Sequence, residues 1–476
     1  MTDESTLLSQ NNAADETSLK YMLKLAAPMV VMNISFTVMQ FVDRFMVSRL
    51  GTEALAAILP AGIISFAPAC FAIGVMTSVN TFVSQCLGRG EEKDCSNYCW
   101  QALYMGLVYI SITTSIMWPA SPWIFKALGH EAGVVGLEVT YLRIMLYAQF
   151  LAVFIWANSQ FFMGVHRPII TMYAAITGQA VNVIANYLLI FGKFGFPEMG
   201  IAGAGWGTFI GIGTNACIVM AMFLSSDINS KFASRRTKNL DWSKIKDLVK
   251  VGFPAGFGFM MNMTFWGLIL FGLVGRFGKE SLAATSAVFS CMSVSFMPIV
   301  GLGTALTAAV GKSIGKGRKD IAIKQTGACL RVALVYMGMV GLCFFIFRNG
   351  LMEFWSPDDK EVVRIGAKIF IFAAIFQIFD AALLTYYDAL RGAGDTLWLA
   401  TIEALTATII MGLGGIFMLK FYPELGALGP WAAATCKIIA AAVLNRWRFK
   451  SNKWMEIDLF KHRPLGVQVK VEAVIE

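Results

Sequence analysis

The segment RLGTEALAA, at residues 49–57, recurs as RFGKESLAA at residues 276–284. A spacing of 226 or 227 residues also relates Pro28 to Pro254, GRGEEKD (88–94) to GKGRKD (315–320), and PEMGIAG (197–203) to PELGALG (423–429). A repeat of this length in a chain of 476 residues predicts two halves with the same fold. The basic segment 225–246 would join them.

The composition places both halves in a membrane. Hydrophobic residues make up 57% of the chain and charged residues 14%, with a mean hydropathy of +0.63, whereas soluble domains carry about 25% charged residues. Much of any globule's surface stays in contact with water, so a soluble fold could not bury this much apolar surface. A soluble enzyme, a disordered chain and a disulfide scaffold are therefore excluded.

Twelve apolar stretches have about the 20 residues that a membrane-crossing helix needs. They are 25–48, 54–82, 98–120, 137–162, 168–192, 200–224, 247–274, 281–309, 327–347, 365–389, 397–419 and 427–447. Each half holds six, and an even number gives the halves the same orientation. We expect an all-α polytopic membrane protein with two pseudo-symmetric six-helix bundles around a central cavity, an architecture common among secondary transporters.

The basic residues indicate the orientation. With both termini on one side, that side collects 25 of the 39 Lys and Arg residues, and the opposite side collects nine. Because basic loops favour the cytoplasm, both termini are expected there, in a plasma membrane such as a bacterial inner membrane. This distribution also explains the net charge of +9 without a nucleic-acid partner.

The predicted organisation has four parts. A polar, acidic tail covers residues 1–24 and does not resemble a cleavable signal peptide, which would need a basic start followed by an apolar run. The N-lobe covers residues 25–230, and the C-lobe, with its linker, covers residues 231–448. A C-terminal tail at 449–476 is expected in the cytoplasm and has no assigned role.

Several kinds of chemistry find no support in the sequence. The three His residues (130, 166 and 462) are far apart, and the nine Cys residues are interpreted as reduced and structural. The nearest approach to a phosphate-binding loop, around Gly311-Lys312-Ser313, lacks the first glycine of the motif. We expect no cofactor and no enzymatic activity, with energy from an ion gradient unless the protein is a passive carrier or channel.

Ionisable groups inside apolar spans are candidate functional residues, because a charge at the bilayer centre costs at least ~2.5 kcal/mol. Asp43 lies in the first span, three residues after Gln40, and Asp380 and Asp388 lie in the tenth. The alternatives are a local ion pair between Asp43 and Arg44 and a purely structural role for Asp380. Glu403 and Lys437 are interpreted as an inter-helix pair or as snorkelling side chains.

Two further polar and aromatic sets accompany these acids. Asn182 and Asn186 share one helical face of the fifth span, where interhelical hydrogen bonding is the alternative to a site. Close helix packing is expected at a glycine stripe in the sixth span, formed by Gly203, Gly207 and Gly211. The candidate lining of a cavity for greasy cations is aromatic, although core packing is the alternative for each: Phe36, Trp266, Phe376 and Tyr386.

Residues 20–450 resemble the multidrug and toxic compound extrusion (MATE) family. The most specific strings are NVIANYLLIFGKFGFPEMGIAGAGWGT (182–208) and FDAALLTYYDALRGAGDT (379–396), which are similar to the NorM-type branch. The resemblance implies antiport, in which an organic cation leaves as Na⁺ or H⁺ enters. It also implies that Asp43, Asn182, Asn186 and Thr208 form a cation-coupling group, and that Asp380 is the acid of the C-terminal half.

One position departs from the NorM-type pattern. That pattern places a Glu eight residues after the Pro of the seventh span, and eight residues after Pro254 stands Asn262. A C-terminal cation site would then hold one carboxylate from these two positions, although an amide oxygen can still coordinate a hard cation. We therefore expect coupling at Asp43, with a substrate or second cation site around Asp380, Asn262, Gln40 and Asp388.

These observations predict a secondary active efflux antiporter, acting as a monomer on amphipathic organic cations in the lipid bilayer. The nearest alternative is a lipid-linked oligosaccharide flippase of the same superfamily, and an ion channel is another. In-span acids outnumber the in-span cations that are not at a helix edge, which favours a cationic substrate over the flippase. The sequence leaves open whether the coupling ion is Na⁺ or H⁺.

Overall fold

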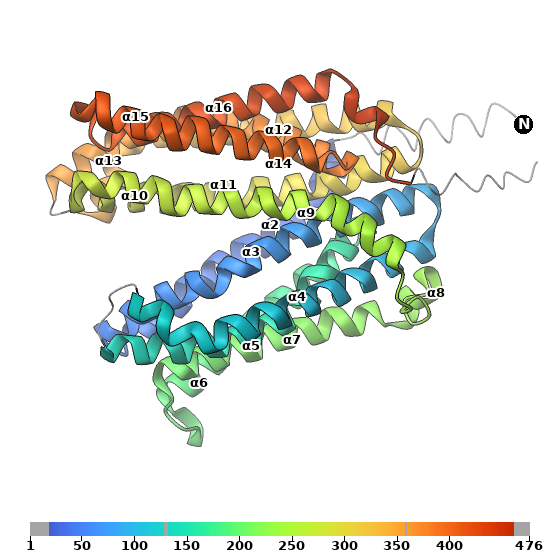
Figure 1. Cartoon of the computed structure of the whole chain (residues 1–476), viewed down its shortest axis with the longest axis horizontal. Coiled ribbons are helices and arrows are strands. Elements are labelled where there is room, and N and C mark those ends of the chain that lie inside the picture. The colour runs from blue at the N-terminus through green and yellow to red at the C-terminus, as the bar shows by residue number, and fades with distance from the viewer. Residues whose placement is uncertain (1–18, 128–131, 358, 461–476) are drawn as a thin grey trace, which may run out of the picture.

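The computed structural model describes residues 19–127, 132–357 and 359–460. Helices and turns account for the regular structure in these ranges, with no strand among them (Figure 1). Within these described ranges, twelve helical segments are long and apolar enough to cross a membrane, which confirms the predicted twelve-span, all-α fold. Residues 1–18 and 461–476 of the expected tails lie outside the described residues, as do His130 and His462.

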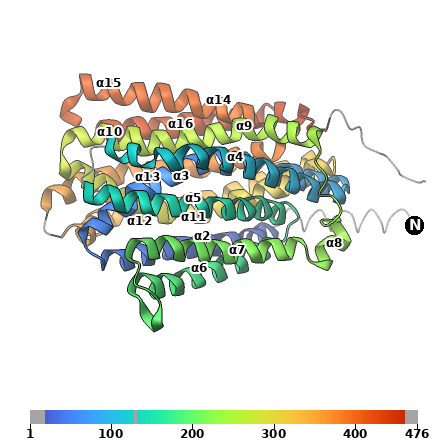
Figure 2. The ribbon, with the colours of Figure 1, turned by 60° about the horizontal axis from the view of Figure 1, so that its bottom comes forward.

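Six long helices form the N-lobe: α2 (Leu19–Ser48), α3 (Thr52–Arg89), α4 (Glu92–Ala127), α5 (Ala132–Gly164), α6 (Pro168–Phe191) and α7 (Gly200–Phe223), with the short turn η1 (Lys193–Gly195) between α6 and α7. The C-lobe contains α9 (Trp242–Thr264), η2 (Phe265–Leu270), α10 (Phe271–Val274), η3 (Gly275–Phe277), α11 (Lys279–Gly315), α12 (Lys319–Trp355), α13 (Lys360–Ala393), α14 (Thr396–Leu405), η4 (Thr406–Leu413), α15 (Gly414–Phe421), η5 (Pro423–Leu425), α16 (Leu428–Lys450) and η6 (Lys453–Glu456). The small helix α8 (Ser226–Phe232) lies in the connection between the lobes. Figure 2 shows the two sets of helices from a second direction.

The repeated motifs are helix junctions that require glycine. Gly51 before α3 and its repeat partner Gly278 before α11 have φ of +108° and +96°, and Gly90 and Gly317 after these helices have φ of +76° and +73°. Residues with a Cβ rarely adopt this region. The sequence repeat therefore reflects the same turn geometry at both ends of two equivalent helices.

Two of the spans predicted as continuous helices are interrupted by π-helical turns. The seventh span changes from α9 to the π segment η2, and the eleventh changes from α14 to the π segment η4. The two π segments contact each other. Such segments are rare and occur frequently at functional sites, and these two begin three residues after Asn262 and Glu403.

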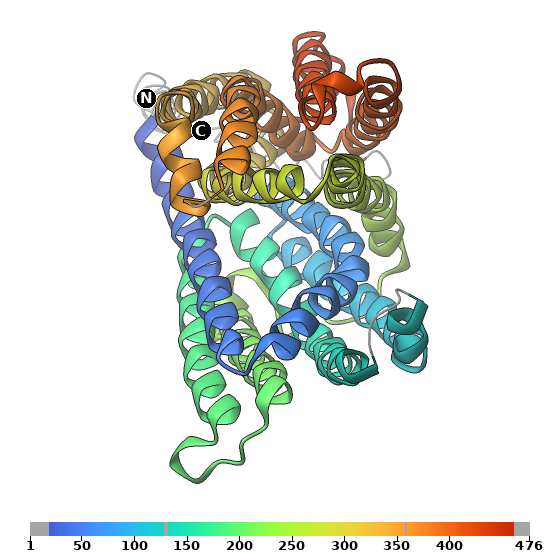
Figure 3. The same cartoon turned by 90° about the vertical axis from the view of Figure 1, so that its left-hand side faces the viewer.

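The side of the bundle where α2 begins and α16 ends is called the terminal side here. The two lobes converge at this side, on the right in Figure 1, and their ribbons diverge toward the left. In the view from that left-hand side, the blue helix α2 runs along one edge of the molecule from the C-lobe helices to the N-lobe helices (Figure 3), and it contacts α11 of the C-lobe and α6 of the N-lobe. The first turns of α2 pack in the C-lobe core through Met22, Leu25 and Ala26.

Pseudo-equivalent glycines of α3 and α11 bring the lobes together. Gly74 of α3 lies against the backbone of Gly256 in α9, and its repeat partner Gly301 of α11 lies against the backbone of Met29 and Val30 in α2. A Cβ added at Gly74 or at Gly301 would lie less than 3 Å from the nearest of these backbone atoms. The same packing solution is therefore used twice, once by each half.

The lobes pack even more closely near the end of α3. A Cβ at Gly88 would collide with the carbonyl of Lys312, and a Cβ at its partner Gly315 would collide with the carbonyl of Gln85. Gln85 also donates from Nε2 to the Gly392 carbonyl of α13 at 2.9 Å. These contacts hold the two lobes together at the terminal side. We refer to Gly88, Gly315, Gln85, Lys312 and Gly392 as the terminal seal.

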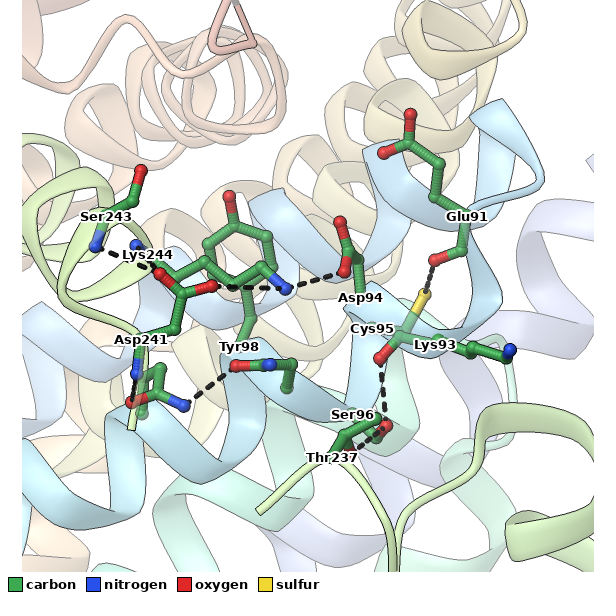
Figure 4. A network of polar contacts seen from close by, with 12 residues as sticks. Glu91, Lys93, Asp94, Cys95, Ser96, Tyr98, Thr237, Asp241, Ser243 and Lys244 are labelled. Atoms are coloured by element: carbon green, nitrogen blue, oxygen red, sulfur yellow. Dashed lines mark hydrogen bonds and ion pairs between the residues drawn. The ribbon is translucent and has the colours of Figure 1, made fainter. Parts of the chain in front are cut away.

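The linker between the lobes is attached to α4 by side-chain hydrogen bonds. Ser96 lies 2.8 Å from the hydroxyl of Thr237, and Lys244 of α9 donates to Asp94 at 2.6 Å (Figure 4). Lys244 is buried and also lies 3.8 Å from Asp241, which accepts the N–H of Ser243. The start of the C-lobe is thus held firmly against the N-lobe.

The residues after α16 return toward the N-lobe. Trp454 is buried and stacks on Phe449 with ring centroids 5.1 Å apart, and Lys319 donates to the Met455 carbonyl at 2.6 Å. Phe460 then packs into the N-lobe core, with the guanidinium of Arg89 4.6 Å from its ring centroid. The first part of the expected C-terminal tail therefore contacts both lobes at the terminal side.

Candidate functional site

The N-lobe places one carboxylate among neutral amides. Asn186 of α6 donates from Nδ2 to Oδ1 of Asp43 in α2 at 2.8 Å. The same Nδ2 donates to Oδ1 of Asn182 at 3.4 Å, and Nδ2 of Asn182 donates to the hydroxyl of Thr208 in α7 at 3.3 Å. The four residues expected to form the cation-coupling group therefore lie in one connected chain.

Glycines of α7 make room for the two amides. A Cβ at Gly207 would collide with Oδ1 of Asn186, and a Cβ at Gly211 would approach the Cβ of Asn182 within 2.5 Å. Gly203 packs as closely on the Leu189 carbonyl, so the predicted role of this stripe in close helix packing is confirmed. The stripe also holds the polar pair at the α6–α7 interface.

One oxygen of this group has no partner. Oδ1 of Asn186 is buried and accepts no hydrogen bond, although buried polar atoms are nearly always satisfied. Asp43 itself is only partly buried. The N-lobe group thus combines the partly exposed carboxylate of Asp43 with an unsatisfied acceptor oxygen on Asn186, which lies 143 residues later in the sequence.

Helix α2 connects this group to the other lobe. Ten residues before Asp43, Asn33 donates to the Met297 carbonyl of α11 at 3.2 Å. Gln40 and Phe36, three and seven residues before Asp43, are both exposed and share its face of the helix. These two predicted residues therefore lie on the same face of α2 as Asp43.

The C-lobe holds a denser group of charges. Glu403 of α14 accepts from the ammonium of Lys437 at 2.7 and 3.0 Å and from Nδ2 of Asn262 at 2.9 Å. This contact confirms the predicted inter-helix pair of Glu403 and Lys437. Asp380 of α13 is within electrostatic range of both members of the pair. Its Oδ2 is buried and has no hydrogen-bond partner.

Asp388 is separate from this group. It forms an ion pair with Arg391 at 2.6 Å, its carbonyl accepts from the hydroxyl of Thr307 at 3.0 Å, and its carboxylate covers Gly303 of α11. The i, i+3 spacing of Asp388 and Arg391 on one helix is sufficient to predict such a pair. The structure therefore brings Asn262, but not Asp388, into contact with the C-lobe charges.

The C-lobe aromatic candidates lie in packed cores. Trp266 packs edge-on against Phe376, with centroids 5.7 Å apart, and also against Trp431. Phe376 belongs to the buried C-lobe cluster, and Tyr386 packs on Phe449 in the neighbouring cluster. Of the four predicted lining residues, Phe36 is the exposed one, at 45%.

The sequence reasoning did not include Glu403 and Lys437 in the site. Their link to Asn262 spans three different helices, and no local spacing reveals it. Their burial inside apolar spans was the available signal, because an intramembrane charge is rare unless it has a partner or a function. Tyr141, a buried residue of α5 in electrostatic range of Asp43, was also missed.

An apolar pocket of about 120 Å³ lies elsewhere, between α3, α4 and α9. Phe71, Met76, Tyr109 and Phe253 are among its lining residues, and no charged side chain lines it. It therefore contains none of the candidate site residues.

The chain is similar to known proteins over nearly its whole length. The family model MatE matches the chain twice, at residues 28–188 and 254–414, so each half matches it once, beginning at Pro28 and Pro254. A probable multidrug resistance protein NorM of Mesorhizobium japonicum is 26% identical over 437 residues, covering 89% of this chain and 92% of its own length. Multidrug resistance protein PmpM of Pseudomonas aeruginosa is 27% identical over 438 residues, covering 90% of both chains.

Solved structures share the fold. A multidrug resistance MATE family transporter in an outward-facing conformation superposes with a TM-score of 0.84 at 18% identity, over 93% of this chain and 98% of its own. A MATE crystal structure in a bent conformation gives a TM-score of 0.84 at 17% identity, over 94% and 99% of the two chains. At this level of identity the likeness establishes the arrangement of helices alone.

Proposed function

The chain belongs to the MatE family, a family of membrane transporters and not of enzymes, and from this premise we propose that it is a secondary active multidrug efflux antiporter. Its cargo is an amphipathic organic cation, exchanged for Na⁺ or H⁺. The relatives named multidrug resistance proteins support the export of drug-like compounds. The protein acts as a monomer in the plasma membrane, with the terminal side facing the cytoplasm and no cofactor.

The observation that carries the proposal is the Asp43–Asn186 contact inside a spanning helix bundle. A partly buried carboxylate with a neutral amide partner can accept either a proton or a hard cation, which prefers oxygen ligands. Asn182, Asn186 and Thr208 supply the neutral oxygens of this coupling group. Asp380, with an unpaired buried oxygen, holds the positive charge of the cargo from the other lobe.

Exchange follows from the position of α2 between the lobes. Neutralising Asp43 removes the need to keep its charge hydrated, and the end of α2 can then move into the lobe. Pro28 lies inside α2 and removes a backbone hydrogen bond there, so the helix can bend at its start. Ion and cargo are both positive and depend on the same few intramembrane carboxylates. Binding of one therefore favours release of the other, and exchange needs no covalent chemistry.

Ethidium export from proteoliposomes tests the proposal. The purified protein is reconstituted once and then given either an inward Na⁺ gradient or an inward proton gradient, each with the other ion balanced. We expect one of the two gradients to drive export, and Asp43→Asn at equal reconstitution to reduce it to the level of protein-free vesicles. Export by Asp43→Asn equal to that of the wild type would overturn the coupling role of Asp43.

A further inference from the structure

The interior of the C-lobe carries its own positive charge. Lys437 of α16 is 1% exposed, and its ammonium contacts both carboxylate oxygens of Glu403. An ammonium has three N–H donors, and two of them are directed at Glu403. Asp380 is buried with an Oδ2 that has no hydrogen-bond partner and lies within electrostatic range of both Lys437 and Glu403, so we treat the three charges as one group.

This group has the composition of a cation site that is already filled. Two carboxylates and one amide, from three helices, accompany the ammonium: Glu403 contacts it, Asn262 donates to Glu403, and Asp380 lies within electrostatic range of both charges. Carboxylate and amide oxygens are the ligands that hard cations take in proteins. The two π-helical segments η2 and η4 begin within three residues of Asn262 and Glu403, as is frequent where helices are adapted to a site.

We propose that the ammonium of Lys437 is a tethered cation that takes the place of a free inorganic cation in the C-lobe, so that Asp380 and Glu403 bind no Na⁺. A tethered group competes at a high effective concentration, and its removal from Glu403 would leave a buried charge unpaired. The consequence for coupling, that exchangeable cation binding is confined to Asp43, rests on the function proposed above. The proposal that Lys437 occupies the C-lobe site does not depend on that function.

The N-lobe provides the contrast that makes the inference testable. Asp43 accepts from the neutral amide of Asn186, whereas Glu403 accepts from a cation. Replacing Lys437 by Ala leaves two carboxylates without compensation and opens the space of three methylene groups and an ammonium. The C-lobe should then acquire a binding site for a free cation.

Binding of ²²Na⁺ to purified protein at a mildly alkaline pH tests this, with Asp43→Asn in every sample to silence the N-lobe. We expect no specific binding to D43N or to D43N/K437R, which keeps the positive charge. We expect near-stoichiometric binding to D43N/K437A, and its loss again in D43N/K437A/D380N. The assay needs no transport, so its outcome is independent of whether ethidium is exported.

Two results would overturn the proposal. One is specific ²²Na⁺ binding to D43N that disappears in D43N/D380N, because the C-lobe would then bind Na⁺ with Lys437 in place. The other is a monodisperse D43N/K437A that binds no more ²²Na⁺ than D43N. If D43N/K437A does not fold, the comparison of D43N with D43N/D380N decides the question by itself.

Discussion

In the N-lobe, Asp43 accepts from the neutral amide of Asn186, whereas the C-lobe holds Asp380 and Glu403 together with the ammonium of Lys437. The N-lobe acid is only partly buried, and the C-lobe acids are buried. A charge that must be exchanged has to be reachable, and a buried charge has to be compensated. The difference therefore assigns exchange of the coupling ion to the N-lobe, and compensation of buried carboxylates by Lys437 to the C-lobe.

The backbone of the two lobes does not show this difference. Gly51 and Gly278 start equivalent helices with the same unusual φ, and Gly88 and Gly315 pack reciprocally at the terminal seal. At the position of Asp43, however, the repeat offset leads to Ile269 or Leu270. The duplicated frame sets how the lobes meet, and the side chains that differ set what each lobe does.

The largest effect is expected in the C-lobe, for Glu403→Gln. This change leaves the buried ammonium of Lys437 without its carboxylate, and breaking a buried ion pair from one side costs about 3–5 kcal/mol of stability. Thermal unfolding of the detergent-purified protein, followed by fluorescence-detected size exclusion, measures the loss.

The matched control is the double variant Glu403→Gln with Lys437→Met, in which both charges are removed. It should recover most of the stability lost in the single variant, because replacing a whole buried pair by neutral side chains is often close to neutral. A double variant as unstable as Glu403→Gln alone would show that the pair is not the source of the effect.

The next effect tests the shared frame. Gly88→Ala and Gly315→Ala each place a Cβ against a carbonyl of the other lobe, and such overpacking costs about 1–3 kcal/mol. Because the two contacts are reciprocal, both variants should loosen the terminal seal to a similar extent. Spin labels at the exposed positions Lys93 and Lys324 would report a broader distance distribution in both, measured by electron–electron double resonance in a cysteine-free background. A broadening in one variant alone would break the symmetry of the seal.

A smaller effect is expected for Asn186→Ala, which removes the donor to Asp43. A hydrogen bond to a charged group contributes about 1.5 kcal/mol, so the cation concentration for half-maximal export should shift about tenfold. The shift is to higher concentration if the ion is Na⁺, because an oxygen ligand is lost. It is to lower concentration if the ion is H⁺, because the carboxylate loses the donor that stabilises its charge. Asn182→Ala is the control, and a shift as large as that of Asn186→Ala would contradict a site centred on Asp43.

Much of this arrangement could be predicted from the sequence where the signal was local or repeated. The motifs around Gly51 and Gly278 predicted the two lobes, and the spacing of Asn182 and Asn186 placed both amides on one face of a helix. Contacts between helices were harder, because they depend on the rotation and depth of each helix. Asn262 lies 141 residues from Glu403, and no pattern in the chain encodes their register.

The aromatic candidates show the same limit. Trp266 and Phe376 were predicted as possible cavity lining, but they pack against each other in the C-lobe core. Composition cannot distinguish an aromatic side chain that faces a cavity from one that fills a core, since both sit in apolar helices. Phe36 and Gln40, which were predicted for the substrate or second cation site, are both exposed and share the helix of Asp43.

The smallest effect is expected at the end of the N-lobe chain of hydrogen bonds, for Thr208→Val. The hydroxyl of Thr208 accepts from Asn182 at 3.3 Å and does not contact Asp43 in that chain. A long bond between neutral groups contributes about 0.5 kcal/mol, so the half-maximal cation concentration for ethidium export should shift about twofold, in the direction found for Asn186→Ala.

The C-lobe counterpart is Asn262→Ala, which removes a neutral donor from Glu403 and should leave the cation dependence unchanged, because Lys437 still compensates that carboxylate. A larger shift for Asn262→Ala than for Thr208→Val would place cation exchange in the C-lobe and reverse the assignment of the two lobes.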